Sequence, residues 1–389
     1  MAVQDRDSDE DRTEVLTLDE LIATTTDPEP APAEPSGPTP GGWVARVAVG
    51  LVLAWAVLCY PTNVLSPFTV GGVEANAVSE AVIFAVIGLS LNVLIGYVGT
   101  ISLGHQAFVG IGAFTSAYVV TEMGQEFFIA ALVASLVGAA QAALLGAVSL
   151  RVTGLYFGLI TLSYGIMTQE SIFQIESLTG GTAGQAAPRP LGFESDFRYY
   201  YLCLLVLALV VFIDWRLMAT KGGRALLALR ENPRVAATWG INVKAYTVLA
   251  FAVSGLFAGL GGALLAHRDL NVVANPFDFR LALVFIMMTV IGGLRNRAGV
   301  VAGAAFFALL RNGELLELLR VADVFAKPPI SLTAEVMPLV LGPVLLLLTI
   351  TLFPGGFGQL TSTVGRWLRG GPFRFVKADK EVQITDVRA

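Results

Sequence analysis

Long apolar runs constrain the fold of this chain more than any other feature. A membrane-spanning helix needs roughly 20 predominantly apolar residues. Scanning the 389-residue sequence for such runs gives ten candidates, 43–60, 76–96, 103–121, 127–150, 154–172, 199–216, 245–267, 281–294, 299–312 and 336–353. The composition agrees, because 55% of the residues are hydrophobic and 14% are charged. The sequence therefore predicts an all-α polytopic membrane protein of about ten transmembrane helices in a lipid bilayer.

Two of these runs, 281–294 and 299–312, are short for a span. They are tilted, extend further than the apolar residues suggest, or form one broken element. Small residues at four-residue spacing also mark the runs, as in Gly255, Gly259 and Ala263, and again in Gly299 and Gly303. Such spacing lets helix backbones approach closely in lipid, so we expect tight helix packing there.

Polar segments flank the apolar body. Residues 1–42 contain eleven acidic residues, two arginines and a run of prolines, a composition that cannot bury enough apolar surface to fold. These residues carry nine net negative charges, so a whole-chain charge of −5 leaves +4 for the remainder. We expect a disordered acidic arm over 1–42, a transmembrane domain over 43–357 and a basic tail over 358–389.

The positions of lysine and arginine predict the orientation. Residues 216–244 hold six basic residues against one acid, which places the connection 217–244 in the cytoplasm. Arg46, Arg151, Arg295, Arg297 and the basic residues of the tail fall on the same side when spans are counted from there. The connections 61–75, 173–198, 268–280 and 313–335 show no basic excess. We therefore expect both termini to be cytoplasmic, in a plasma or inner membrane.

The cytoplasmic connection contains its own helix signals. Asn232 suits an N-cap, Pro233 is favoured at the first helical position, and Gly240 suits the left-handed residue after a helix. The pattern predicts a helix from Pro233 to Trp239 that follows a helical stretch over 224–230. The second helix would present three apolar side chains, those of Val235, Ala236 and Trp239. Such an element either lies in a groove on a partner protein or rests on lipid headgroups.

The stretch GYVGTISLGHQAFVGIGAF, residues 96–114, interrupts two apolar runs. Gly96 and Gly99 should end the first helix, and Thr100 or Ser102 should cap the next, leaving free N–H groups at its start. Broken helices occur at membrane depth only where they pack in protein or line a cavity, and in some transporters they face the substrate. The predicted substrate pathway or gate therefore includes Gly96, Gly99, Thr100, Ser102, Gly104 and His105. His105 is either functional or a neutral side chain bonded to a backbone carbonyl.

Several stretches together resemble the branched-chain amino acid ABC transporter permease family, in its LivM branch. They are residues 96–114, GLYFGLITL (154–162), LTGGTAG (178–184), the segment 223–266, VIGGLRNRAGVVAGA (290–304) and LFPGGF (352–357). The resemblance covers residues 80–357. It implies an ABC importer permease of a type II-like architecture, and it adds the paired glycines Gly292 and Gly293 to the gate. It also identifies residues 217–244 as the coupling loop to an ATPase, with Arg230, Asn232, Pro233, Val235, Ala236, Trp239 and Gly240 as the coupling residues.

The chain departs from the family pattern at two places. Arg295, Asn296 and Arg297 stand where the family usually has a small, neutral turn after the paired glycines. The acidic residue that is often found in the coupling loop is absent around 235–238.

The chain contains no ATP-binding motif, because no Gly-Lys pair occurs in it. It also shows no catalytic or metal-binding constellation, so we expect no enzyme activity and no cofactor in this chain. The resemblance implies two ABC ATPase subunits that bind ATP and Mg, a second, related permease subunit and an extracytoplasmic substrate-binding protein, with no role for nucleic acid. Three functions remain open. They are ATP-driven import of branched-chain or similar small amino acids, import of urea, short amides or an aromatic acid by the same architecture, and an ATP-independent channel or ion-coupled carrier.

Overall fold

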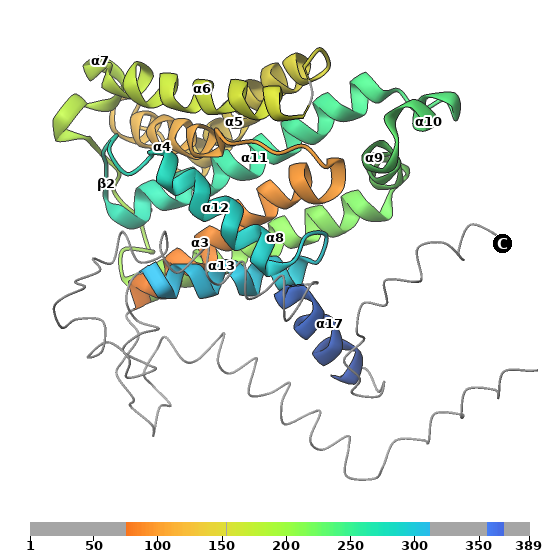
Figure 1. Ribbon diagram of the computed structural model, residues 1–389. Helices are drawn as coiled ribbons and strands as arrows, with labels where there is room; N and C mark the ends of the chain where they lie inside the picture. The colour runs from red at the N-terminus through yellow and green to blue at the C-terminus, as the bar shows by residue number, and fades with distance from the viewer. Residues whose placement is uncertain (1–74, 153, 312–355, 369–389) are drawn as a thin grey trace, which may run out of the picture. The chain divides into compact units, whose positions relative to one another are not determined.

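The computed structural model describes residues 75–152, 154–311 and 356–368. The expected arm 1–42, the expected spans 43–60 and 336–353, and tail residues 369–389 lie outside this part of the chain. The described part is mainly helical (Figure 1). In chain order its elements are α3 (Ala75–Leu91), η2 (Asn92–Val98), α4 (His105–Thr121), α5 (Phe127–Ser149), α6 (Leu155–Glu170), η3 (Ile172–Gln174), α7 (Glu176–Thr179), η4 (Gly181–Ala183), β1 (Gln185–Ala186), α8 (Asp196–Ala219), α9 (Lys221–Glu231), α10 (Pro233–Thr238), α11 (Val243–Asp269), β2 (Asn271–Val272), α12 (Phe279–Gly292), α13 (Arg297–Arg311) and α17 (Phe357–Leu368).

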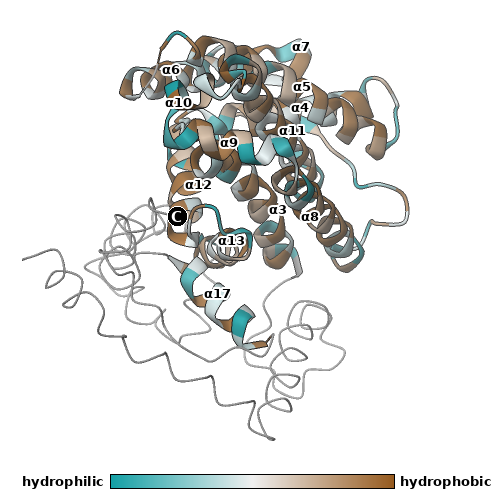
Figure 2. Ribbon diagram, turned by 90° about the vertical axis from the view of Figure 1, so that its right-hand side faces the viewer, coloured by the Kyte–Doolittle hydropathy of each residue, from teal (hydrophilic) through white to brown (hydrophobic). Residues whose placement is uncertain are grey.

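Each of the eight expected spans within the described residues contains a helix. Four helical segments there are long and apolar enough to cross a membrane, namely Asn76–Val98, Phe127–Ser149, Asp196–Ala219 and Val243–Asp269. Figure 2 shows these long helices mainly in the hydrophobic colour. The apolar runs at 281–294 and 299–312 form two separate helices, α12 and α13, joined by a short turn. The full count of ten spans remains a prediction.

The helix α3 lies at the centre of the described bundle. In the segment Asn76–Val98, which contains α3 and η2, 94% of the most apolar stretch is buried. The corresponding buried share is 39% in α5 and 33% in α8. Helix α3 contacts α13, α11, α8 and α12, while α11 also packs along α5 and α4. The outward faces of α5 and α8 carry large apolar side chains, including Leu132, Leu144 and Leu205. These two helices therefore offer apolar surface to lipid or to another subunit.

Glycines let the backbones of the long helices touch, as their spacing predicts. A Cβ atom at Gly255 of α11 would overlap the carbonyl oxygen of Gly138 in α5. A Cβ atom at Gly259 would likewise overlap the carbonyl of Ala134. On α13, a Cβ at Gly303 would overlap a carbonyl of α12. Because lipid provides little hydrophobic drive between helices, this close packing is a main source of their association.

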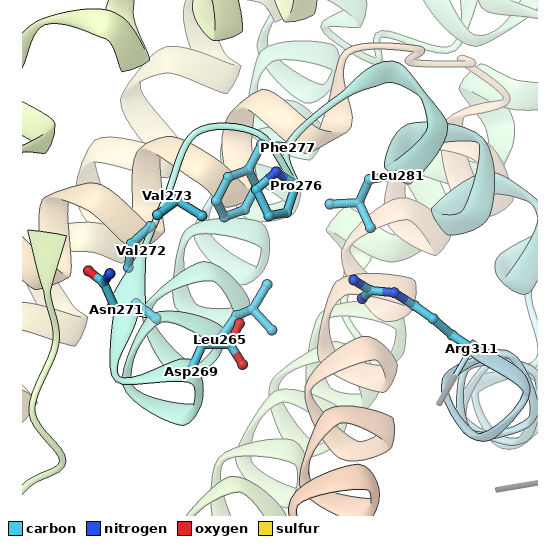
Figure 3. Close-up of a pocket in the computed structure, with 10 residues that line it drawn as sticks. Leu265, Asp269, Asn271, Val272, Val273, Pro276, Phe277, Leu281 and Arg311 are labelled. Atoms are coloured by element: carbon cyan, nitrogen blue, oxygen red, sulfur yellow. The ribbon is translucent and has the colours of Figure 1, made fainter. Parts of the chain in front are cut away.

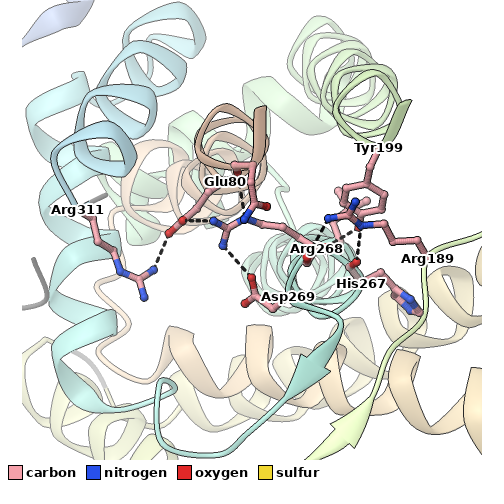
Figure 4. Close-up of polar contacts among 9 residues, drawn as sticks. Glu80, Arg189, Tyr199, His267, Arg268, Asp269 and Arg311 are labelled. Atoms are coloured by element: carbon pink, nitrogen blue, oxygen red, sulfur yellow. Dashed lines mark hydrogen bonds and ion pairs between the residues drawn. The ribbon is translucent and has the colours of Figure 1, made fainter. Parts of the chain in front are cut away.

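One end of the bundle is held by ion pairs and a small sheet. The carboxylate of Glu80, at the start of α3, accepts from Arg268 of α11 and from Arg311 of α13, each at 2.7 Å (Figure 4). Arg268 also bonds Asp269 at 2.8 Å. Nearby, β1 and β2 pair antiparallel, with Gln185 opposite Val272. These ion pairs link the start of α3 to the ends of α11 and α13. The expected orientation places this end of the bundle outside the cell.

Candidate functional site

The break in the first described span is built by a π-helix and a glycine. The α-helical hydrogen bonding of α3 gives way at Asn92 to the π-helix η2, which ends at Val98. Gly99 follows with φ +80°, a left-handed conformation that favours glycine, and the chain then runs without regular structure until α4 begins at His105. π-Helical turns bend helices and are frequent at functional sites. The predicted break is therefore present, and Gly99 ends the first helix.

Two details of the predicted break are wrong. Gly96 lies inside the π-helix rather than ending it. Neither Thr100 nor Ser102 caps the second helix, because the residue before His105 is Gly104 and no side chain bonds the first N–H groups. Ser102 stands two residues before the cap position, and its hydroxyl is fully buried without a partner among the described residues.

Gly104 is a point of close contact between α4 and α6. A Cβ atom there would overlap the carbonyl oxygen of Thr161. The same threonine accepts a hydrogen bond through Oγ1 from the backbone N–H of Leu103, at 3.0 Å. The backbone of Gly104 has φ −108°, so the need for glycine comes from packing rather than from a left-handed conformation.

His105 is held by two serines in the core. It is fully buried, and its Nε2 lies 2.8 Å from the hydroxyl oxygen of Ser90 in α3. That hydroxyl donates to the carbonyl of Ser254 in α11 at 2.7 Å. Since the serine proton is used there, His105 must donate from Nε2–H, which leaves Nδ1 without a proton in a neutral ring. The partner of His105 is therefore a hydroxyl rather than the expected backbone carbonyl.

Buried polar atoms without a partner gather on both sides of the break. Among the described residues they include Nδ2 of Asn92, Oγ of Ser102, Nδ1 of His105 and both amide atoms of Gln106. All four side chains are fully buried. Leaving a buried polar atom unbonded is costly, so such atoms usually meet water or a solute. The break is therefore a polar region inside an apolar bundle.

A second polar cluster joins the π-helix to its neighbours. Asp214 of α8 is fully buried and accepts from the hydroxyl of Tyr97 at 2.9 Å. It also accepts from Nε of Arg297, while Nη2 of that arginine donates to the Asp214 carbonyl at 3.3 Å. From α9, Arg230 donates to the carbonyl oxygen of Gly96. We call Tyr97, Asp214, Arg230 and Arg297 the inner cluster, since the expected orientation places it toward the cytoplasm.

The paired glycines lie at the end of α12 and the start of the turn to α13. Gly292 ends α12, and a Cβ there would lie 2.8 Å from Cα of Val300, so the two helices pack closely. Gly293 follows with φ +99°. Two residues later, the N–H of Arg295 donates to Oδ1 of Asn92 at 2.8 Å. The predicted gate residues therefore form two groups, and the Arg295–Asn92 bond links the turn to the π-helix.

The predicted helix pair of the connection 217–244, α9 followed by α10, forms as its sequence predicts, and we call it the elbow. Oδ1 of Asn232 accepts from the N–H groups of residues 234 and 235, at 3.0 and 3.3 Å, Pro233 begins α10, and Gly240 has φ +78°. Val235 is 51% exposed and Trp239 is 81% exposed. Ala236, expected beside them as a third available apolar side chain, is instead buried, at 3% exposure. Arg230 of α9 donates to the carbonyl of Gly96.

Sequence reasoning missed the pairing of Asp214 with Arg297. Arg297 entered it only through the orientation and as a departure from a family pattern. A charged residue inside an apolar run was the available signal, because such residues in membrane segments are usually paired.

This arrangement of apolar helices, a broken span with a buried polar lining and an amphipathic elbow defines a helical membrane permease. Comparison with known proteins agrees, because residues 75–348 match the family described as "Branched-chain amino acid transport system / permease component". The chain belongs to this family of ABC-type permeases. The members it resembles are transport components rather than enzymes.

The relatives include permeases for several solutes. The chain is 29% identical over 274 residues to the high-affinity branched-chain amino acid permease LivM of Salmonella typhimurium, covering 63% of this chain and 64% of the relative. LivM of Escherichia coli is 28% identical with the same coverage. The guanosine permease NupQ of Bacillus subtilis is 29% identical over 260 residues, which is 57% of this chain and 76% of the relative. The matched part thus spans less than two thirds of either LivM protein. No solved structure matches this chain.

Proposed function

We propose that this chain is a transmembrane permease subunit of an ATP-driven importer for branched-chain or similar small amino acids, located in the cell membrane. The observation that carries this proposal is the exposed elbow. Trp239 is 81% exposed on a short, well-capped helix, where a large aromatic side chain in a small patch marks a contact with a partner. In this proposal the partner is an ABC ATPase subunit, and the two LivM relatives support an amino acid as the solute.

The contact between Arg230 and Gly96 supplies a route from the elbow to the broken span. The guanidinium at the end of α9 holds a carbonyl of the π-helix, and the side chain also covers Gly99, where a Cβ would lie 3.2 Å from its Cγ. When the ATPase moves the elbow, this arginine transmits the displacement to the end of the π-helix. Alternating access then requires the inner cluster to separate and reform, because its ion pair ties α8 to α13.

The polar lining of the break supports its place in the solute pathway or gate. A permease must replace some of the water around a charged solute while keeping the rest of the bundle apolar. The unpartnered atoms of Ser102 and Gln106 offer hydrogen bonds at the start of α4, where no side chain caps the helix. Two ATPase subunits, a second permease and an extracytoplasmic binding protein complete this proposed assembly.

A second candidate solute follows from the relatives. The guanosine permease NupQ is matched over a larger share of its length than the LivM proteins. The same architecture could thus import another small solute, including the urea, amides or aromatic acids considered above. Measuring which solute the full complex takes up decides between them.

Trp239→Glu tests the proposed role of the elbow. A charge in a desolvated contact should weaken ATPase binding by about 2 kcal/mol or more, which is roughly thirtyfold. The permease should still insert in the membrane, while co-purification of the ATPase and solute uptake are lost. Trp239→Phe keeps an aromatic anchor and should retain both. Normal co-purification and uptake by the glutamate variant would show that the elbow does not couple the subunits.

A further inference from the structure

A small pocket opens beside the ion pairs at the outer end of the bundle. It has a volume of about 90 Å³ and lies between the end of α11, the connection to α12 and the end of α13 (Figure 3). Buried apolar side chains form its walls, those of Leu265, Val272, Phe277 and Leu281. Two partly exposed charged side chains, Asp269 at 45% and Arg311 at 33%, complete the lining. An apolar interior is thus combined with one group of each charge.

The two charged groups keep bonding capacity for a ligand. Asp269 accepts from Arg268 through Oδ1, and a carboxylate has a second oxygen that can accept. Arg311 donates to Glu80 through Nη1, while a guanidinium carries five N–H donors. Figure 4 shows the ion-pair chain Arg311–Glu80–Arg268–Asp269, which fixes both groups in place. A cationic group can therefore bind Asp269, and an anionic group can bind Arg311, while the Arg268–Asp269 and Arg311–Glu80 ion pairs stay intact.

We infer that this pocket binds a zwitterionic α-amino acid with a small aliphatic side chain. The ammonium group binds Asp269, the carboxylate binds Arg311, and the side chain enters between the apolar walls. The inference rests on the proposed transport of small amino acids and adds a site of first contact at the outer end. It gives this chain a part in solute selection that neither the elbow nor the helix break supplies.

The volume of the pocket sets the size of the side chain. A benzene molecule occupies a cavity of roughly 150 Å³, so a side chain of three or four carbons needs roughly 75–100 Å³ and a benzyl group roughly 175 Å³. The observed value of about 90 Å³ fits the side chain of valine, leucine or isoleucine. Phenylalanine is too large to enter without displacing a wall.

Substrate protection of a cysteine tests the pocket directly. Asn271 is exposed and lines the pocket, so Asn271→Cys is made in a chain whose Cys59 and Cys203 are replaced with alanine. The full transporter complex in lipid nanodiscs is then labelled with a maleimide. Leucine or valine at about ten times its dissociation constant leaves about one tenth of the sites free, so labelling should slow about tenfold. Leucine should not protect Leu191→Cys, an exposed position outside the pocket.

Analogues that lack one charge separate this inference from nonspecific apolar binding. Leucinamide lacks the carboxylate and 4-methylpentanoate lacks the ammonium group, so each should protect about tenfold less well than leucine at equal concentration, which corresponds to about 1.4 kcal/mol. Phenylalanine should not protect. In the protein, Asp269→Asn should remove protection by leucine, while Arg280→Gln should keep it, because Arg280 is an exposed arginine outside the pocket.

Two outcomes overturn the inference. One is equal protection by leucine, leucinamide and 4-methylpentanoate, and the other is no protection by leucine at any concentration. The analogue experiments leave the charged pocket residues intact, so they decide the question even where Asp269→Asn prevents assembly. ATP-dependent uptake by the same complex is measured separately. A complex that takes up leucine without protection refutes only the pocket, whereas protection without uptake of any amino acid refutes only the proposed transport function.

Discussion

Replacing Arg297 with leucine should destabilise this permease more than replacing its partner Asp214. The two side chains form the ion pair of the inner cluster, but their exposures differ, since Asp214 is fully buried and Arg297 is 28% exposed. Without Arg297, the carboxylate of Asp214 remains buried, and within the described part of the chain its remaining partner is the hydroxyl of Tyr97. Without Asp214, the remaining guanidinium can turn toward water.

The magnitude follows from this difference. Removing one partner of a buried ion pair costs about 3–5 kcal/mol when the other charge stays buried. We expect a loss of about 3 kcal/mol for Arg297→Leu, because the Tyr97 hydrogen bond at 2.9 Å remains. For Asp214→Leu we expect at most about half of that loss, since the exposed arginine is partly solvated. The double variant should recover most of the stability, because a well-packed apolar pair often replaces a buried ion pair without loss.

The assay is the fraction of purified complex that stays monodisperse after heating, measured by gel filtration. In a domain of about 200 residues, 1 kcal/mol shifts the midpoint by about 2–4 °C. The midpoint should therefore fall by roughly 6–12 °C for Arg297→Leu and by less than half of that for Asp214→Leu. Equal losses in the two single variants, or additive losses in the double variant, would refute the reasoning.

Three further predictions concern the break and the orientation. Gly104→Val should abolish uptake while the protein still inserts, because its Cβ overlaps a carbonyl of α6; uptake at the parental rate would show that this contact is not needed. His105→Gln should transport nearly as well as the parent with the same pH profile, because an amide can also donate to the hydroxyl of Ser90, and a slow variant with a flattened profile would favour ion coupling. A cysteine at Leu191 should react with a membrane-impermeant thiol reagent on intact cells, whereas one at Lys221 should not, and the reverse pattern would invert the orientation.

Local signals predicted the elbow well. Asn232, Pro233 and Gly240 act within a few residues of their own positions, so the cap, the start and the end of α10 could be read from the sequence. The break was predicted for a similar reason, because glycines interrupt the apolar run, and Gly99 adopts a left-handed backbone. The start of α4 was misplaced by the choice of cap residue. Which of several small polar residues lies next to the first helical turn depends on how α4 meets α6.

Contacts between distant segments could not be predicted in this way. Asp214 and Arg297 are 83 residues apart, and no periodicity relates them. The burial of Ala236 and the inward direction of Arg230 likewise depend on how the elbow packs against the bundle. The pocket at the outer end needs residues from α11, its following connection and α13 together, so its charges were visible in the sequence but their common site was not.

ATP-driven uptake by the reconstituted complex tests the central claim most directly. The permease pair and its ATPases are placed in proteoliposomes, the binding protein is supplied on the opposite side of the membrane from the ATPases, and accumulation of radiolabelled leucine is followed with ATP or with a non-hydrolysable analogue. The account predicts that leucine accumulates against a gradient with ATP but not with the analogue. It also predicts that this accumulation is lost when Trp239 is replaced with glutamate. Equal leucine entry with and without ATP hydrolysis would contradict it and identify a passive channel instead.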